Sequence, residues 1–173
     1  MITYIRTISR QRAAWALLAA SAFAFELCGL FFQHVMGLFP CVMCVYERLA
    51  FIGILVAALV ALIAPQKPWL RWPALLLWGY SAFRGLQLSL QHVDYQLNPS
   101  PFNTCSFFAE FPSWMPLDKW IPWMFYPTGD CSERQWAFLG WEMPQWLVLI
   151  FACYLAVALI IMVGNLAKGR CCQ

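Results

Sequence analysis

Apolar residues fill four long stretches of the chain, at residues 13–32, 45–64, 72–90 and 145–163. Each stretch approaches the roughly 20 residues that an α-helix needs to cross the hydrocarbon core of a bilayer. Helices are the expected form, because lipid offers no hydrogen-bond partner to the open backbone groups of other structures. Residues 1–173 are therefore predicted to form one all-α membrane domain, a bundle of four transmembrane helices.

The first stretch also has features of a secretory signal, because arginines precede it and alanines at positions 20, 22 and 24 match the small residues of a cleavage site. Its apolar residues nevertheless continue to Phe32, which is beyond the length of a usual signal core. We therefore expect a retained membrane helix.

Basic residues mark the short segments beside these stretches, and short cytoplasmic loops are enriched in Lys and Arg. Three segments carry basic residues and no acidic ones: Arg6, Arg10 and Arg12 before the first stretch, Lys67 and Arg71 between the second and third, and Lys168 and Arg170 after the fourth. Both termini are therefore predicted to be cytoplasmic. Residues 33–44 and 91–144 then form the two outer loops.

The second outer loop is rich in proline and tryptophan. Its residues 114–123 combine aromatic, charged and apolar side chains, a composition typical of segments that rest at the lipid headgroups. We expect a short interfacial helix here. The alternative is an ordinary packed loop, since long loops are often simply structural.

The composition agrees with a membrane protein. Hydrophobic residues make up 62% of the chain and charged residues 11%, whereas a soluble domain carries roughly 25% charged residues. The net charge of +3 is small and the basic residues form no long run, so the sequence gives no support for a nucleic-acid partner. A lipid bilayer is the expected surrounding.

Four of the eight cysteines fall in the outer loops: Cys41, Cys44, Cys105 and Cys131. Disulfides persist outside the cytoplasm and are rare within it. Four cysteines permit three pairings. Cys41 and Cys44 are close enough in sequence to pair with each other, which leaves Cys105 with Cys131.

The other four cysteines carry less information. Cys28 and Cys153 lie inside apolar stretches and are interpreted as small apolar residues. Cys171 and Cys172 are interpreted as part of an unstructured tail.

The Cys-Val-Met-Cys motif lies where the chain enters the second stretch, just after Pro40, and proline suits the first turn of a helix. Free amides and the helix dipole at that position stabilise a thiolate. Arg48, one turn after Cys44, shares that helix face and adds a permanent positive charge. Zinc is disfavoured, because a zinc site normally needs four ligands and His34 is the only other soft ligand near Cys41 in sequence.

The second pair closes a long loop and has two interpretations. As a structural staple, the Cys105–Cys131 bond would stabilise the fold by restricting the unfolded chain. As a shuttle disulfide, it would be exposed to attack by the thiolate of a partner. The chemistry of this pair alone does not decide between them.

Three further polar residues lie close to the predicted membrane. Glu26 and Arg84 are both six residues from the outer ends of their stretches, so we expect them to pair across the bundle. His92 lies at the outer end of the third stretch. It is a candidate donor of a hydrogen bond or proton to a quinone oxygen, or an ordinary residue of the rim.

Several motifs together are similar to the disulfide bond formation protein B (DsbB) family, and the similarity covers nearly the whole chain. They are Gln33-His34-Val35-Met36, Pro40-Cys41-Val42-Met43-Cys44-Val45-Tyr46-Glu47-Arg48, Tyr80-Ser81-Ala82-Phe83-Arg84-Gly85, Pro99-Ser100-Pro101-Phe102, Pro116-Leu117-Asp118-Lys119-Trp120, Gly129-Asp130-Cys131, Glu133-Arg134-Gln135-Trp136 and Glu142-Met143-Pro144-Gln145-Trp146.

This resemblance implies a quinone-dependent thiol oxidase of the bacterial inner membrane. A periplasmic thioredoxin-fold partner, similar to DsbA, would attack Cys105, and Cys131 would then engage the Cys41–Cys44 disulfide. Cys44 would contact the ring of a ubiquinone or a menaquinone, with Arg48 stabilising the negative charge.

The resemblance also implies that His92 and Met143 lie near the quinone. Two alternatives remain open at this point. The chain could be a membrane scaffold or transporter with two structural disulfides, or a paralogous thiol oxidase that serves another partner.

Overall fold

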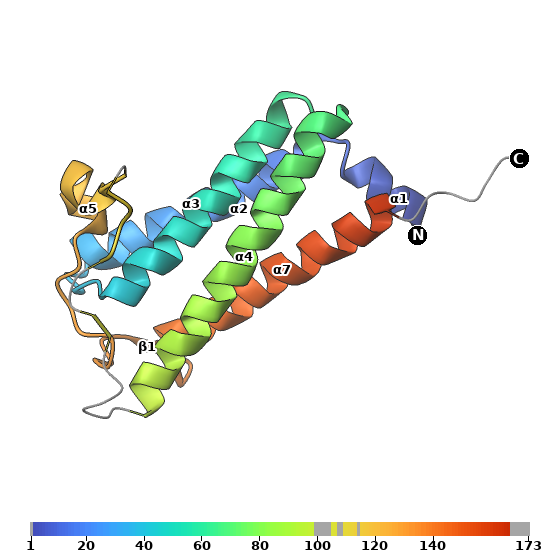
Figure 1. Ribbon diagram of the computed structural model, residues 1–173. Helices are drawn as coiled ribbons and strands as arrows, with labels where there is room; N and C mark the ends of the chain where they lie inside the picture. Colours follow the sequence, from blue (N-terminus) through green and yellow to red (C-terminus); the bar gives the residue numbers. More distant parts are fainter. Residues whose placement is uncertain (1, 99–104, 107–108, 114, 167–173) are drawn as a thin grey trace, which may run out of the picture.

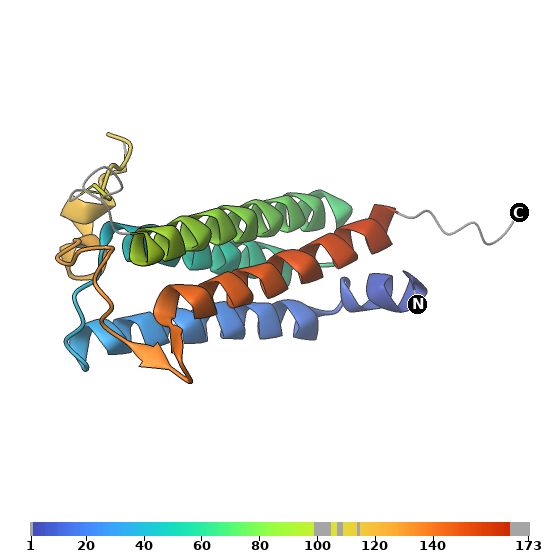
Figure 2. The ribbon, with the colours of Figure 1, turned by 90° about the horizontal axis from the view of Figure 1, so that it is seen from below.

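The computed structural model describes residues 2–98, 105–106, 109–113 and 115–166. Four long helices run side by side (Figures 1 and 2), namely α2 (Arg12–His34), α3 (Val42–Ile63), α4 (Pro68–Leu97) and α7 (Met143–Leu166). The smaller elements are α1 (Ile2–Ile8), α5 (Leu117–Trp120), α6 (Pro122–Phe125), β1 (Ala137–Phe138) and β2 (Trp141–Glu142). The prediction of a mainly helical domain is confirmed.

Three helices, α2, α3 and α7, are long and apolar enough to cross a membrane by their length and composition. Within the described chain α4 is not among them, although it is the longest helix. Its sequence holds Arg71, Arg84 and Asp94 together with several glutamines, which lower its mean hydropathy.

Small side chains allow the long helices to pack closely, as in other membrane bundles. Helix α3 lies between α2 and α4, and α4 also packs against α7. Phe51 of α3 stacks on Phe151 of α7 with ring centroids 4.4 Å apart. Gly85 of α4 leaves room for that ring, because a Cβ at this position would lie 2.3 Å from the Phe151 ring.

The two ends of the bundle differ. Helix α1, the α3–α4 turn and the end of α7 lie at one end, and the long loop with α5 and β1 lies at the other (Figures 1 and 2). At the first end Arg6 donates hydrogen bonds to the carbonyls of Gly164 and Asn165, and Arg12 donates to that of Ile63. The segment before α2 and the α3–α4 turn, both predicted to be cytoplasmic, therefore lie at the same end of the bundle. The candidate cysteines lie at the other end.

A small hairpin leads into α7. Ala137 pairs with Glu142 and Phe138 pairs with Trp141 in an antiparallel ladder. The two residues between the strands, Leu139 and Gly140, both have positive φ, at 53° and 81°. This geometry is that of a two-residue turn whose twist matches the flanking strands.

Two features differ from the sequence-based picture. Helix α4 continues to Leu97, so the first seven residues of the segment 91–144 are helical rather than part of a loop. The predicted interfacial segment 114–123 carries two short helices of four residues each rather than one, α5 and α6, and α6 extends past this segment to Phe125.

Cys28 and Cys153, interpreted as small apolar residues, are both exposed on the surface of the bundle.

Candidate active site

Cys41 and Cys44 lie at the N-terminus of α3. Cys41 is the N-cap residue, and its sulfur accepts a hydrogen bond from the backbone amide of Cys44 at 3.3 Å. The two sulfur atoms are 2.9 Å apart and are not bonded to each other. The disulfide predicted between them is therefore not formed here. The contact with Cys44 and the burial of Cys41 raise the pKa of the Cys41 thiol well above its usual range.

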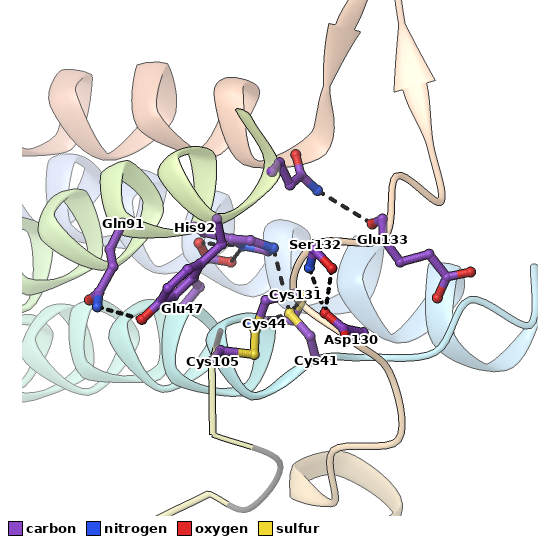
Figure 3. Close-up of a disulfide and its surroundings, with 12 residues drawn as sticks. Cys41, Cys44, Glu47, Gln91, His92, Cys105, Asp130, Cys131, Ser132 and Glu133 are labelled. Atoms are coloured by element: carbon purple, nitrogen blue, oxygen red, sulfur yellow. Dashed lines mark hydrogen bonds and ion pairs between the residues drawn. A yellow bond between two sulfur atoms is a disulfide. The ribbon is translucent and has the colours of Figure 1, made fainter. Parts of the chain in front are cut away.

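His92 reaches this pair from α4. Its Nε2 atom lies 3.6 Å from the sulfur of Cys41, and its Nδ1 atom lies 3.2 Å from a carboxylate oxygen of Glu47 (Figure 3). Glu47 and His92 are almost completely buried, at 2% and 3% exposure. Glu47 therefore fixes the orientation of the imidazole that faces Cys41.

Cys105 and Cys131 form a disulfide, which confirms the pairing predicted from the sequence. Cys131 is 1% exposed, whereas Cys105 is partly exposed. Cys41 and Cys131 belong to one cluster of buried side chains with Met43, and the two cysteine pairs lie next to each other (Figure 3). The fold thus brings together four cysteines that are up to 90 positions apart in the sequence.

The chain just before Cys131 is docked on the residues just before Cys41. The backbone amides of Thr128 and Gly129 both donate to the carbonyl of Pro40, at 2.9 and 3.1 Å. The approach is so close that a Cβ at Gly129 would lie 2.4 Å from the carbonyl oxygen of Phe39. Absence of a side chain at Gly129 therefore allows the two cysteine pairs to meet.

Asp130 precedes Cys131 on the solvent side of the same turn. Its carboxylate accepts hydrogen bonds from the backbone amide and the hydroxyl of Ser132, at 2.8 and 2.7 Å. These two bonds hold the pKa of Asp130 below its usual range. A negative charge therefore remains beside the outer disulfide at neutral pH.

Arg48 is buried, and its guanidinium joins three segments. One nitrogen donates to the side-chain oxygen of Gln33 at 2.8 Å and to the carbonyl of Met124 at 2.6 Å. Another lies 3.9 Å from a carboxylate oxygen of Glu26. The predicted pairing of Glu26 with Arg84 is therefore wrong. Arg84 is exposed on α4, which packs mainly against α3 and α7, and it donates to Gln87.

A cavity of about 310 Å³ opens beside these groups. Its lining includes all the residues that the sequence placed near a quinone: Cys44, Arg48, His92 and Met143. Cys41 and Glu26 also line it. Its apolar walls come from several large side chains: Phe25, Phe32, Trp136, Trp146, Leu147 and Ile150.

Sequence reasoning did not assign a role to Glu47 or Gln33. Glu47 is a carboxylate inside an apolar helix, and such a position is by itself a sign of function or of a buried partner. Gln33 gave no such sign, because a glutamine at a helix end is ordinary. Only the fold reveals that it contacts both Arg48 and, through its side-chain nitrogen, the carbonyl of Trp123.

Comparison with known proteins agrees with this geometry. The family model described as "Disulfide bond formation protein DsbB" matches residues 11–161. A disulfide bond formation protein B of Aeromonas salmonicida is 66% identical over the full length of both chains. Proteins of the same name from Yersinia pestis and Escherichia coli are 55% and 54% identical over 98% of this chain and 96% of theirs.

Proposed function

Since the chain belongs to the DsbB family of disulfide bond formation proteins, and is thus a disulfide oxidoreductase of the multi-pass membrane type, we propose that it is a quinone-dependent thiol oxidase. It oxidises the dithiol of a periplasmic, DsbA-like thioredoxin-fold partner to a disulfide. The two electrons pass through the Cys105–Cys131 pair to the Cys41–Cys44 pair, and from there to a membrane quinone.

The contact between the two cysteine pairs is the observation that carries this proposal. Thiol–disulfide exchange needs the attacking sulfur and the disulfide to touch. Cys131 packs in the same buried cluster as Cys41, and that cluster borders a cavity in the bundle. Two purely structural disulfides would have no need of mutual contact.

The different exposure of Cys105 and Cys131 supports an order for the exchange. Cys105 is the more accessible sulfur, so the partner's thiolate bonds to it and the Cys105–Cys131 bond breaks. The electron pair leaves with Cys131, which is buried against Cys41. Cys131 then attacks the sulfur of Cys41 in the oxidised inner pair, so a Cys41–Cys131 bond forms, the Cys41–Cys44 bond breaks and Cys44 leaves as a thiolate. The partner's second thiolate displaces Cys105, which attacks Cys131 and releases Cys41, so the outer disulfide is restored and the inner pair is left reduced.

The cavity fits the headgroup of a quinone. Its walls are mainly apolar, and a few polar groups converge on it, as in small-molecule sites generally. One of them is Glu26, whose buried carboxylate oxygens accept no hydrogen bond within the described structure. When bound, a ubiquinone or a menaquinone would supply the acceptor for two electrons and two protons.

The chain's own residues prepare this site. Arg48 is fixed by Gln33 and Met124 and presents a permanent positive charge at the cavity wall, where it stabilises the Cys44 thiolate. His92 is oriented by Glu47 and hydrogen bonds to the sulfur of Cys41. Met143 contributes apolar surface from the first residue of α7.

The topology is part of the proposal. Helices α2, α3, α4 and α7 would all cross the bacterial inner membrane. Two of the polar residues of α4, His92 and Gln96, are buried inside the bundle. The four reactive cysteines then face the periplasm, and the exposed aromatic rings of Trp120 and Trp123 in α5 and α6 rest at the headgroups.

Two cysteine variants test this division of labour in the purified, full-length protein. Cys105→Ser should lose oxidation of a reduced thioredoxin-fold partner, yet its inner pair, once reduced by dithiothreitol, should still reduce quinone. Cys44→Ser should lose quinone reduction, because the sulfur at the cavity is gone. Both activities are followed by quinone absorbance and by trapping free thiols.

Cys153→Ser is the matched control, because Cys153 is an exposed free cysteine in the middle of α7 and belongs to neither reactive pair. It should retain both activities. If Cys105→Ser oxidised the partner at the normal rate, the loop disulfide would be a structural staple. A scaffold or transporter with static disulfides would then be the better description.

A further inference from the structure

Sequence spacing disfavours zinc at the Cys41–Cys44 pair, because it offers only His34 as a further soft ligand, but the fold brings His92 to this pair. Three soft ligand atoms thus converge at the end of α3. The sulfur atoms of Cys41 and Cys44 and the Nε2 atom of His92 all lie within 4.8 Å of one another. The sulfur of Cys41 and Nε2 of His92 are 3.6 Å apart. In a tetrahedral zinc site with Zn–S of about 2.3 Å and Zn–N of about 2.05 Å, the sulfur and nitrogen are about 3.6 Å apart.

Glu47 supplies a second and independent observation. It holds the other ring nitrogen of His92 at 3.2 Å, and it is itself 2% exposed. A carboxylate on the far side of a metal-ligating histidine is the usual arrangement around zinc, because it fixes the tautomer and makes Nε2 the ligand. The structure therefore has both the ligands and the group that orients one of them.

We propose that the reduced Cys41–Cys44 pair forms, with His92, a redox-gated site for a thiophilic divalent cation such as Zn²⁺ or Cd²⁺. On binding, the two thiols and Nε2 of His92 give up their protons to solvent, and the imidazole keeps the proton on Nδ1 toward Glu47. The fourth position faces the cavity and takes a water molecule, as in open Cys₂His sites.

Binding requires one local change. The sulfurs of Cys41 and Cys44 are 2.9 Å apart, whereas two sulfurs on one zinc ion are about 3.8 Å apart. Rotation of the partly exposed Cys44 side chain about its Cα–Cβ bond opens this distance without moving α3. Oxidation to a disulfide removes both thiolates, so the oxidised protein has no site.

The consequence for activity rests on the proposed function. A cation on the reduced pair occupies the sulfurs that must pass electrons to the cavity, so it holds the protein in its reduced form. Thiophilic metals would then inhibit the protein, and a chelator would remove the metal and restore activity. The binding itself does not depend on whether a quinone is the electron acceptor.

The test uses the full-length chain in detergent, with every cysteine except Cys41 and Cys44 replaced by serine. Cd²⁺ alone is the probe, and its thiolate absorbance in the ultraviolet reports binding. We expect one equivalent to bind to the reduced protein and none to the same protein after oxidation. Equal binding by the oxidised protein, or the absence of any binding by the reduced protein, would overturn the inference.

Histidine variants identify the third ligand. His92→Ala should weaken binding by at least about tenfold and Glu47→Gln by roughly tenfold, the range typical of orienting groups. His34→Ala is the matched control, because His34 is exposed at the end of α2 and should leave the affinity unchanged. Unchanged affinity in His92→Ala would remove the histidine from the site.

X-ray absorption at the metal edge identifies the ligand atoms in a protein that keeps His92. This check therefore does not depend on the folding of a histidine variant. We expect two sulfur neighbours and one nitrogen with an imidazole scattering pattern. Two sulfurs with oxygen alone would contradict the proposed ligand set. If the metal binds as expected and quinone turnover by the wild-type protein is unaffected, the inferred inhibition is wrong. If the metal binds but the metal-free wild-type protein reduces no quinone, the proposed function fails while the metal site stands.

Discussion

At the scale of single residues, Arg48 links three segments that are distant in sequence. It belongs to α3, and it hydrogen bonds Gln33 at the end of α2 and the carbonyl of Met124 in the outer segment. It also lies beside the buried carboxylate of Glu26. This arginine is thus both a charge at the cavity and a tie between α3 and the segment that covers the site.

Replacing Arg48 should therefore affect both activity and stability. In Arg48→Ala the partly buried acceptors on Gln33 and Met124 lose their donor, which costs about 1 kcal/mol or somewhat more of unfolding free energy. Quinone reduction should fall on the order of 100-fold, as for other lost stabilising donors in active sites. Arg48→Lys should recover part of the activity, because it keeps the charge and loses the planar fork.

Quinone reduction and thermal unfolding of the purified variants measure these two effects. Arg84→Ala is the matched control, since Arg84 is an exposed arginine on α4. It should change neither quantity appreciably. Normal turnover in Arg48→Ala at both low and saturating quinone would show that Arg48 acts only as a structural tie.

Asp130 gives a prediction on pH. Its pKa is lowered by the amide and hydroxyl of Ser132, so the turn before Cys131 gains stability from the ionised carboxylate. A lowered pKa means that this contribution is complete above the ordinary value of about 3.9 and is lost as pH falls through the lower, folded value. Asp130 is exposed, so the effect on global stability should be small.

Carboxyl NMR titration of Asp130 tests this directly. The midpoint should lie below the ordinary value in the native protein and should move upward in Ser132→Ala, which removes one of the two hydrogen bonds. A midpoint at the ordinary value in both proteins would mean that the turn does not hold the carboxylate.

These residue contacts also show which features of the site the sequence alone does not predict. The depth of Glu26 and Arg84 along their helices suggested a pair, but depth does not give the direction in which a side chain points around the helix axis. Glu26 instead meets Arg48 of the neighbouring α3. The quinone-site candidates Arg48, His92 and Met143 all line one cavity. Spacing along the chain indicated Arg48 and His92, whereas Met143 was indicated only by the resemblance to a family.

At the scale of elements, docking of the outer segment on the entry to α3 decides whether the cysteine pairs meet. Gly129→Ala should push the segment away, because its Cβ would lie 2.4 Å from the backbone oxygen of Phe39, which cannot rotate aside. Electron transfer from the outer pair to the inner pair should then slow by roughly 10- to 100-fold, since a displacement of about 1 Å has costs of that order.

The measurement is the rate of quinone reduction driven by a reduced thioredoxin-fold partner. Thr128→Ala is the control: Thr128 is exposed and contributes its backbone amide, which the substitution keeps. If Gly129→Ala transferred electrons as fast as Thr128→Ala, close docking of this segment would not be needed for the relay.

The helices themselves were largely predictable, because apolar stretches of about 20 residues have few alternatives in lipid. The end of α4 was not. Hydropathy ends the third stretch at residue 90, whereas the helix continues to Leu97. The polar residues of this last part include His92 and Gln96, which are buried against the site. Polar side chains that are buried beside the site lower the hydropathy of this last part of the helix. A hydropathy pattern therefore places the end of the helix too early.

At the scale of the whole molecule, the bundle separates a basic end from a reactive end. Arg6 and Arg12 hydrogen bond to the ends of α7 and α3, on the side of the bundle opposite the long loop. The cysteine pairs and the cavity lie near the other end, at the N-terminus of α3. This arrangement suits a protein that receives electrons at one membrane surface and delivers them to a lipid-soluble acceptor.

The central claim is that Cys131 hands electrons to the inner pair because it is packed against Cys41. The most direct measurement uses the Cys44→Ser/Cys105→Ser double variant, in which Cys41 and Cys131 have each lost their first partner. Mild oxidation followed by peptide mass spectrometry should reveal a Cys41–Cys131 disulfide that forms rapidly in the folded protein and slowly in the denatured chain. If the two cysteines stayed unbonded in the folded protein, or linked no faster than in the denatured chain, the relay between the two pairs would be contradicted.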